Sequence, residues 1–310
     1  MAKKGCDNKE TGLLNVQEYL HETCGDRVDV LDATTRAWLG ALTKGAYTVR
    51  LAGSSRRFTE PAAAHAVEHG IWLRTLPSPF NGIVDEAWLK MALAANLADT
   101  PDVLAVAMQY TRGAPALYDR DVQIAGAAEY GPLVNAARQE GSDFNDYLGM
   151  VWHYEHGVVD HPETAQFRCL DCSGYMRMIW GFRHHLEGTA CGDKVPLCLN
   201  PRPDRSAMPR RAHEIFEYGP GVVVVAREGD GVGDLSAIQV GDLVFFDADK
   251  GDGERLDHVG MYLGLNDGGH QRFISSRKTH NGPTLGDYGG ASVLDGSGHY
   301  ARSFRAARRL

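Results

Sequence analysis

The first hundred residues alternate between polar stretches and short apolar patterns. Residues 1–26 are polar and lack clear periodicity, which predicts a loosely held amino-terminal arm. Asp32, placed to cap the stretch ATTRAWLGALTK, predicts a helix over residues 33–44 that ends at Gly45. Two strands are expected from the apolar runs TVRLAG and HGIWLRTLP, at residues 48–53 and 69–77.

Two further helices are predicted before residue 112. The stretch DEAWLKMALAA, residues 85–95, has the spacing of a short amphipathic helix. The stretch TPDVLAVAMQYT, residues 100–111, opens with Thr100 as N-cap and Pro101 at the first helical position. Because this second helix is nearly apolar, we expect it inside the protein against a sheet.

The remaining chain changes from irregular to β-like. Residues 112–168 are rich in small and polar residues and are interpreted as an elaborated loop, most structured at 140–154. Residues 187–206, with prolines within and beside them, are interpreted as an insertion or lid. Five strands are then expected: GVVVVAR (221–227), GDLVFFDAD (241–249), HVGMYLGLN (258–266), QRFISSRK (271–278) and SFRAARRL (303–310). This order predicts an α+β fold with an antiparallel sheet packed against the helix that begins at Cys172.

The segment CLDCSGYMRMIWGFR places Cys172 at the start of that helix. Apolar residues at positions 175, 176, 179 and 182 share one helical face. In the first turn, unpaired backbone N–H groups and the helix dipole stabilise an anion, and the thiolate is the nucleophilic form of cysteine. The position therefore suits a nucleophile. The alternative is that Cys172 is a small buried hydrophobic residue.

A nucleophilic cysteine needs a base, and His258 is the best placed histidine. It opens the strand HVGMYLGLN, so a rigid sheet can hold it beside a helix terminus. A neighbouring imidazolium would lower the thiol pKa from about 8.5 to between about 3.5 and 7.5. The alternative is a structural or solvent-facing histidine. An acceptor for the other ring nitrogen is expected near Ser275 on the returning strand, with His270 nearer the turn and His280 just past the strand as alternatives.

Composition limits the class of protein. With 310 residues and 43% hydrophobic content, the chain can form one large domain or two smaller ones. No run approaches 18 apolar residues, and MAKKGCDNKETGLLNVQ has no apolar stretch after its lysines, which predicts neither a membrane span nor a Sec-type signal peptide. Cytoplasmic residence is the default expectation, and export without a cleaved signal is the alternative. The net charge of −8 argues against nucleic acid as a partner.

The cysteines suggest free thiols. Six cysteines in 310 residues are too sparse for a disulfide scaffold. Cys169 and Cys172 form a CxxC, which is also compatible with a redox pair. A zinc cluster would have to use His184, His185, Cys191 and Cys198, whose spacing does not match a zinc ribbon. We therefore expect no metal and no cofactor.

Three motifs in order carry a resemblance to a known family. DCSGYMRMIWG, GDLVFF and DHVGMYLG resemble the corresponding segments of NlpC-type cysteine peptidases, a papain-like family of bacterial cell-wall hydrolases. VLAVAMQYTRGAP is similar to the first helix of the family, and SFRAARRL to its last strand. The resemblance covers about residues 100–310, with insertions at about 112–168 and 187–206. Residues 1–99 are then an arm and a small α/β extension of unknown role.

The resemblance implies a papain-like α+β fold and amide hydrolysis through a thioester on Cys172, with His258 as the base. It also implies that the backbone N–H of Cys172 helps to bind the oxyanion. The third polar residue of the family, often histidine, is best matched by Ser275, whose hydroxyl offers no charge. Substrate-binding candidates are Asp171, which either caps the helix or meets a substrate amine, together with Ser173 and Tyr147.

Three functions follow from these observations. The first is a cysteine amidohydrolase that acts on peptidoglycan-type peptides with D-glutamyl or diamino-acid linkages. The second is a cytosolic amidase or acyl transferase that acts on a small peptide or metabolite. The third is a non-catalytic binding module that retains the fold. Sequence does not determine the oligomeric state.

Overall fold

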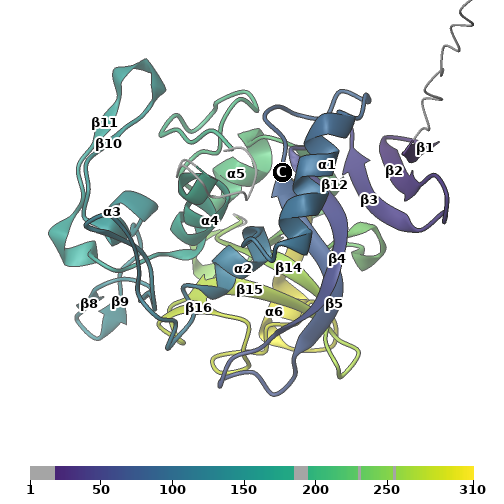
Figure 1. The fold of residues 1–310 in the computed structure, drawn as a ribbon. Helices are drawn as coiled ribbons and strands as arrows, with labels where there is room; N and C mark the ends of the chain where they lie inside the picture. The colour runs from purple at the N-terminus through teal and green to yellow at the C-terminus, as the bar shows by residue number, and fades with distance from the viewer. Residues whose placement is uncertain (1–17, 185–194, 230–231, 254–255) are drawn as a thin grey trace, which may run out of the picture.

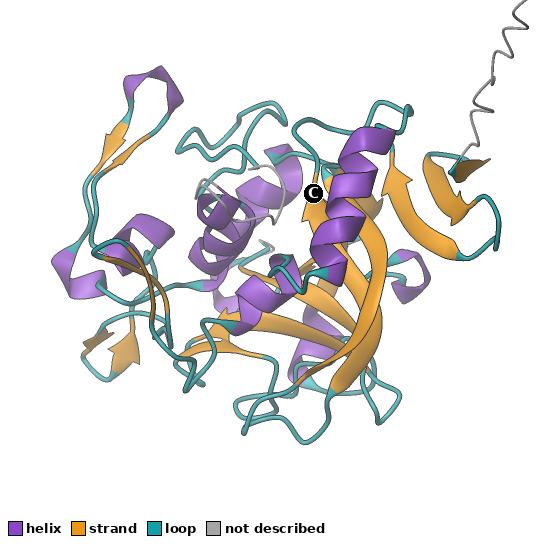
Figure 2. Cartoon of the chain, viewed as in Figure 1, coloured by secondary structure: helices purple, strands orange, loops and turns teal. Residues whose placement is uncertain are grey.

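The computed structural model describes residues 18–184, 195–229, 232–253 and 256–310, which form helices packed on two antiparallel sheets (Figures 1 and 2). The first sheet has the strand order β1-β2-β3-β4-β5. The second has the order β12-β17-β13-β14-β15-β16, and every neighbouring pair in it is antiparallel. The predicted mixture of helices and antiparallel sheet is therefore confirmed. Within the described residues, no helix is long and apolar enough to span a membrane.

The amino-terminal sheet is a meander covered by one helix. Its strands are β1 (Tyr19–Cys24), β2 (Arg27–Asp32), β3 (Trp38–Thr43), β4 (Thr48–Phe58) and β5 (Val67–Thr75). Helix α1 (Glu86–Leu97) lies on β4, and Asp85 caps it by accepting from Ala87 N and Trp88 N. The expected strands at 48–53 and 69–77 and the expected helix at 85–95 are confirmed. The polar stretch 1–26 was expected to be loosely held, but its residues 19–24 form β1, while residues 1–17 lie outside the described residues.

The helix predicted over residues 33–44 is wrong, because residues 38–43 form β3. Asp32 does cap, but it caps a turn, accepting from Thr34 N and Thr35 N. A Cβ on Gly40 would lie 2.7 Å from Leu51 Cδ2 and 2.8 Å from Arg50 O, so this glycine admits the close approach of β4. Pairing with strands on both sides therefore outweighs the local helical preference.

Helix α2 (Val103–Met108) begins later than predicted. Its N-cap is Asp102, which accepts from Ala105 N at 3.0 Å, and not Thr100. The same carboxylate forms an ion pair with Arg56 at 2.8 Å and accepts from Leu73 N at 2.7 Å, so it ties the helix to the first sheet. As expected, α2 is buried, and it packs against β5.

Short elements occupy the stretch between α2 and Cys172. They are β6 (Leu117–Asp119), β7 (Val122–Ala125), β8 (Leu133–Val134), β9 (Ala137–Arg138), α3 (Phe144–Leu148), β10 (Trp152–His153) and β11 (Val159–Asp160). They form three two-stranded hairpins and one short helix, which agrees with an elaborated loop. Of the second expected insertion, residues 187–194 lie outside the described residues, and the described remainder has neither helix nor strand beyond a bridge between Leu197 and Met208.

The second sheet is the central layer that holds the candidate site. Its strands are β12 (Val222–Val225), β13 (Leu243–Phe246), β14 (His258–Leu265), β15 (Gln271–Arg277), β16 (Gly282–Thr284) and β17 (Phe304–Arg309). Helix α4 (Cys172–Trp180) packs on β14 and β15, and α5 (Ala212–Tyr218) on β13, β14 and β17. Helix α6 (His299–Ser303) precedes β17. The five predicted strands are confirmed, and β16 was not predicted.

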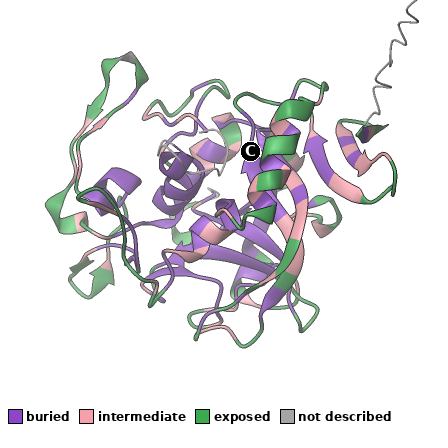
Figure 3. Ribbon diagram, in the orientation of Figure 1, coloured by how far each residue is buried: buried purple, intermediate pink, exposed green. Residues whose placement is uncertain are grey.

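Both faces of this sheet are apolar, which explains the uninterrupted run LVFF. Leu243 and Phe245 join the core that contains α4, whereas Val244 and Phe246 join a second core with Tyr300 of α6. This is the two-residue period of a strand buried on both sides. Figure 3 shows the resulting burial of the central strands and of α4.

The two sheets share a core. Val67 and Leu73 of β5 belong to the same buried cluster as α4, and β5 contacts β14. The carbonyl of Leu310 at the end of the chain accepts from Thr48 N at 2.7 Å. The amino-terminal extension is thus packed directly on the part of the chain that carries Cys172.

Candidate active site

Cys172 is the first residue of α4, as predicted. Asp171 is the N-cap, and its Oδ1 accepts from Gly174 N at 2.8 Å. Every residue of α4 is buried, and Tyr175 Oη donates to Ala107 O of α2 at 2.7 Å. The helix is therefore a rigid support for the thiol, and only 7% of Cys172 is exposed.

His258 begins β14, and the next strand supplies its hydrogen-bond partner. The β14–β15 hairpin brings Ser275 Oγ to 3.0 Å from His258 Nε2, and Ser275 is fully buried. Of the three alternatives, His270 instead contacts Asp295 at 2.9 Å, and His280 lies beside Tyr288. The geometry therefore brings Ser275, and neither of the other two, onto the imidazole, which leaves Nδ1 as the nitrogen available to another group.

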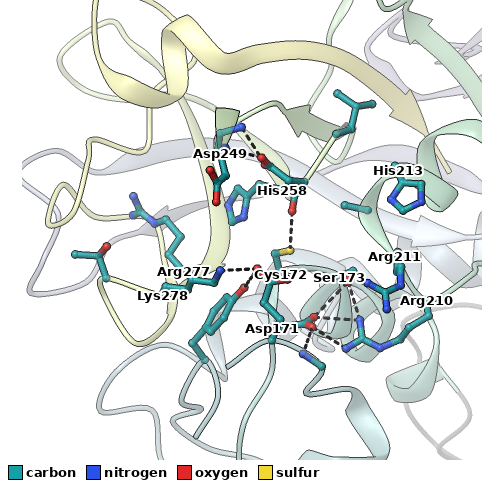
Figure 4. Close-up of a pocket in the computed structure, with 18 of the residues that line it drawn as sticks. Asp171, Cys172, Ser173, Arg210, Arg211, His213, Asp249, His258, Arg277 and Lys278 are labelled. Carbon is teal, nitrogen blue, oxygen red and sulfur yellow. Dashed lines mark hydrogen bonds and ion pairs between the residues drawn. The ribbon is translucent and has the colours of Figure 1, made fainter. Parts of the chain in front are cut away.

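Cys172 and His258 line one cavity of about 740 Å³. Cys172 Sγ lies 3.8 Å from the carbonyl oxygen of Asp257, the residue that precedes His258. Figure 4 shows the thiol and the imidazole on adjoining parts of the cavity wall. The ring of Tyr300 lies 5.4 Å from that of His258 and packs against it. No residue among 18–99 lines this cavity, so the described part of the extension does not form its wall.

Burial opposes charge on both members of this pair. Burial, followed by the nearby carboxylates of Asp171 and Glu140, raises the pKa of the Cys172 thiol above its ordinary value. Burial, followed by the Arg277 guanidinium, lowers the pKa of His258 to about 3. The resting pair is thus a neutral thiol beside a neutral imidazole. The expected lowering of the thiol pKa by an imidazolium is wrong for this site, because neither charged form is solvated.

Asp171 and Ser173 are held by an arginine from a distant segment. Arg210 Nη2 donates to Asp171 Oδ2 at 2.7 Å, and Nη1 donates to Asp171 Oδ1 at 3.2 Å and to Ser173 Oγ at 2.7 Å. Gly141 N also donates to Asp171 Oδ2 at 3.0 Å. Although burial opposes it, the ion pair with Arg210 holds the pKa of Asp171 below its usual value. The predicted helix cap is present, and the carboxylate is an anion with a permanent partner.

The segment that contains the thiol, the imidazole and the Ser275 hydroxyl matches a known family. The family model described as NlpC/P60 family matches residues 152–285, which include Cys172, His258 and Ser275. The match confirms the resemblance to NlpC-type cysteine peptidases, and it implies a papain-like fold and, in general, hydrolase activity of the cell-wall peptidase or amidase kind. No curated protein matches the chain.

One residue predicted for the candidate site does not reach it. Tyr147 has no exposed surface and is absent from the cavity wall. Its hydroxyl donates to Gly126 O at 2.9 Å, and its ring packs edge-on against Tyr110 at 5.5 Å. The prediction that Tyr147 binds substrate is therefore wrong, because its side chain fills the core and not the cleft.

Other residues of the cavity were missed by sequence reasoning. Tyr130, in the elaborated loop, lines the cavity beside Glu140, and its hydroxyl lies 3.4 Å from Glu140 Oε1. Glu140 also pairs with Lys278 at 2.6 Å. Arg210 stands in MPRR, just beyond the predicted insertion at 187–206, where no spacing marks it. These residues are brought together only by the packing of loops on α4, which periodicity does not report.

The described residues also bear on the metal and redox alternatives. Across residues 18–184, 195–229, 232–253 and 256–310, no three His, Cys, Asp or Glu side chains are grouped to hold a metal ion. Of the four residues considered for zinc, His185 and Cys191 lie outside the described residues. Cys169 and Cys172 are free thiols, and burial raises the pKa of Cys169 to about 11.

Proposed function

We propose that the protein hydrolyses an amide bond in this cavity through Cys172, with His258 as the general base and acid and Ser275 as the residue that orients His258. One observation carries the proposal. A cysteine in the first turn of a buried helix and a histidine at the head of a strand line the same cavity, and both residues lie within the matched segment. The hydroxyl of Ser275, 3.0 Å from Nε2, leaves Nδ1 of the imidazole to exchange a proton with the thiol.

The chemistry needs four proton transfers and one acyl intermediate. The proton of Cys172 Sγ passes to His258 as the sulfur attacks the carbonyl carbon, and the oxyanion is stabilised by N–H groups at the start of α4, which have no intrahelical acceptor. The C–N bond then breaks, and the proton passes from His258 to the leaving amine. Water attacks the thioester after giving a proton to His258, and the proton returns to sulfur as the acid is released.

The neutral resting state shapes this proposal. The neutral imidazole has the free lone pair that a general base needs, and the thiol loses its proton only as it attacks. Ser275 supplies a neutral hydrogen bond, so it orients the ring without stabilising an imidazolium as a carboxylate would. We infer a modest contribution from Ser275, within the ~0.5–1.5 kcal/mol of a neutral hydrogen bond.

The proposed substrates are peptidoglycan-type peptides, with cleavage between a D-glutamyl residue and a diamino acid. Support comes from the general activity of the NlpC/P60 family and from a cavity of about 740 Å³, large enough for a short peptide. An amidase or acyl transferase that acts on a small peptide or metabolite would use the same groups. Addition of an external amine separates the two, because a transferase forms a new amide where a hydrolase forms an acid.

A second function is favoured by one observation. The burial of Cys172, which raises the pKa of its thiol, is the property expected of an unreactive cysteine in a non-catalytic binding module. Such a module would bind the same peptides without cleaving them.

The deciding experiment follows peptide cleavage by mass spectrometry in wild type, Cys172→Ala and the matched control Cys169→Ala. Both cysteines are buried, but Cys169 does not line the cavity. We expect cleavage by wild type and by the control, and none by Cys172→Ala. Cleavage by Cys172→Ala at the wild-type rate contradicts the thioester. Binding without cleavage by all three proteins identifies the binding module.

A further inference from the structure

The carboxylate of Asp171 has no capacity left for a substrate amine. Its two oxygens accept from Gly174 N, Gly141 N and both terminal nitrogens of Arg210, at 2.7–3.2 Å. The hydroxyl of Ser173 lies 3.3 Å from Oδ1 as a further contact. A carboxylate offers about four lone-pair positions, and all are used by groups of the protein itself. An ammonium that approached Asp171 would have to displace Arg210.

Arg210 is anchored so that it does not leave easily. Its Nε lies 3.5 Å from Asp143 Oδ2, and Asp143 is itself held by the fully buried Arg177 at 3.0 Å. The guanidinium thus bridges two buried carboxylates, one at the N-cap of α3 and one at the N-cap of α4. Planar, two-pronged pairing of this kind favours arginine over lysine.

The cavity wall beside this pair carries positive charge. Arg211, the next residue, lines the cavity with an exposed side chain, and it forms no ion pair with any described residue. Figure 4 shows Arg210, Arg211 and His213 along one flank of Cys172, opposite Lys278 and Asp249. Lys278 is already neutralised by Glu140. At this flank, an incoming ammonium meets the guanidinium of Arg211, whereas a carbonyl or carboxylate meets an N–H donor.

We propose that Arg210 is a specificity-determining residue that, by occupying Asp171, excludes substrates with a free amino terminus and selects peptides whose amino end is acylated. The inference rests on the proposed function, because it names the substrate class of the same cavity. The favoured substrate is a peptide still joined through its amino end to a larger molecule, and a released peptide is disfavoured.

The first test compares three peptides of one sequence, Ala-γ-D-Glu-Lys, with a free, N-acetylated or N-succinylated amino terminus. We expect wild type to cleave both acylated peptides with kcat/KM at least tenfold above the free peptide. A further preference for the succinyl group indicates recognition of its carboxylate. Arg210→Gln, which frees the Asp171 carboxylate, is expected to lose or invert this ratio, whereas Arg210→Lys retains it. Arg205→Gln removes the same charge outside the cavity and serves as the matched control.

The second test does not need catalysis. Cys172 is modified by an anionic sulfonatoethyl and a cationic trimethylammonioethyl methanethiosulfonate, in which the thiolate displaces methanesulfinate and forms a mixed disulfide. Since both reagents consume the same thiolate, the ratio of their rates reports the local potential and not the thiol pKa. Exposure of one carboxylate near Cys172 in Arg210→Gln should shift the ratio about tenfold toward the cationic reagent. Arg205→Gln should leave it unchanged.

The outcomes separate the two proposals. The specificity inference is wrong if wild type prefers the free peptide. It is also wrong if Arg210→Gln alters neither the kcat/KM ratio of acylated to free peptide nor the ratio of the two reagent rates. If the reagent ratio shifts as expected but wild type cleaves none of the peptides, amide hydrolysis of this substrate class is wrong and the electrostatic selection stands. If Arg210→Gln does not fold, Arg210→Lys decides: a lysine variant that gains the free peptide as a preferred substrate contradicts the inference.

Discussion

Gly174 allows two backbone segments to cross at the candidate site, and an alanine there should disturb both. It lies in the first turn of α4, two residues after Cys172. A Cβ at this position would overlap the carbonyl oxygen of Ser142 and lie 3.0 Å from the Cα of Asp143. Comfortable carbon–carbon contact begins at about 3.5 Å, so one of the two segments must move.

Neither segment can move freely, and this determines how much stability the substitution costs. Ser142 O accepts from Asp171 N at 2.9 Å, and Asp143 is held in its buried ion pair with Arg177. Overpacking costs about 1–3 kcal/mol, and a lost buried hydrogen bond adds about 1–3 kcal/mol. The higher helix propensity of alanine returns about 1 kcal/mol. We therefore expect Gly174→Ala to lower the free energy of unfolding by about 3 kcal/mol.

The assay is urea unfolding followed by tryptophan fluorescence, with Cys172 modification measured on the same samples. Gly298→Ala is the matched control, because a Cβ there meets no atom within 4 Å and φ is −67°. As an N-cap substitution, it should cost only about 0.5 kcal/mol. Gly174→Ala should also change the rate at which Cys172 is modified. If it unfolds within about 0.5 kcal/mol of wild type with unchanged Cys172 reactivity, the close crossing is not a constraint and the reasoning is refuted.

Three further predictions concern the thiol and its partner. Ser275→Ala should reduce kcat/KM for peptide cleavage about tenfold with little change in KM, whereas Ser276→Ala, whose hydroxyl instead contacts Leu170 O, should change stability and leave the pH profile unaltered. Iodoacetamide should modify Cys172 more slowly at pH 8 than the exposed Cys24, with a rate that still rises at pH 10; a plateau below pH 8.5 would show a thiolate instead. The pKa of His258 falls from about 6.5 in the unfolded chain to about 3 in the folded protein, so between these values the unfolded state binds the extra proton. The contribution of His258 to stability is therefore full above pH 6.5 and is lost as the pH falls to 3. His258→Gln should flatten this part of the stability profile, and an unchanged profile would contradict the burial argument.

Several features of the site were predictable from the sequence because their causes are local. Asp171 followed by a helical pattern placed Cys172 in the first turn, since an N-cap and a buried face act within a few residues. The strand alternation after residue 220 placed His258 at the head of β14 and Ser275 on the returning strand. Hairpin geometry then determines which residue faces the imidazole.

Other features were decided by packing between distant segments. Residues 38–43 pair with β2 and β4 although their local pattern suggests a helix. Tyr147 is buried against Tyr110 and not exposed in the cleft. The direction of the thiol pKa depends on how completely α4 and its neighbours remove water from Cys172. In each case, strand pairing or burial against distant segments decides the outcome, and a sequence pattern measures neither.

Sequence alone therefore determined which residues are the candidates for the chemistry, and tertiary structure decided what environment they have. The order of the three motifs identified the NlpC/P60 segment and its cysteine and histidine, because a nucleophile, a base and their supporting elements leave local signatures. The pair of Arg210 with Asp171 spans 39 residues and leaves none. Ion pairs and desolvation act through space over a few ångströms, so only the folded chain shows that the carboxylate of Asp171 is already paired with Arg210.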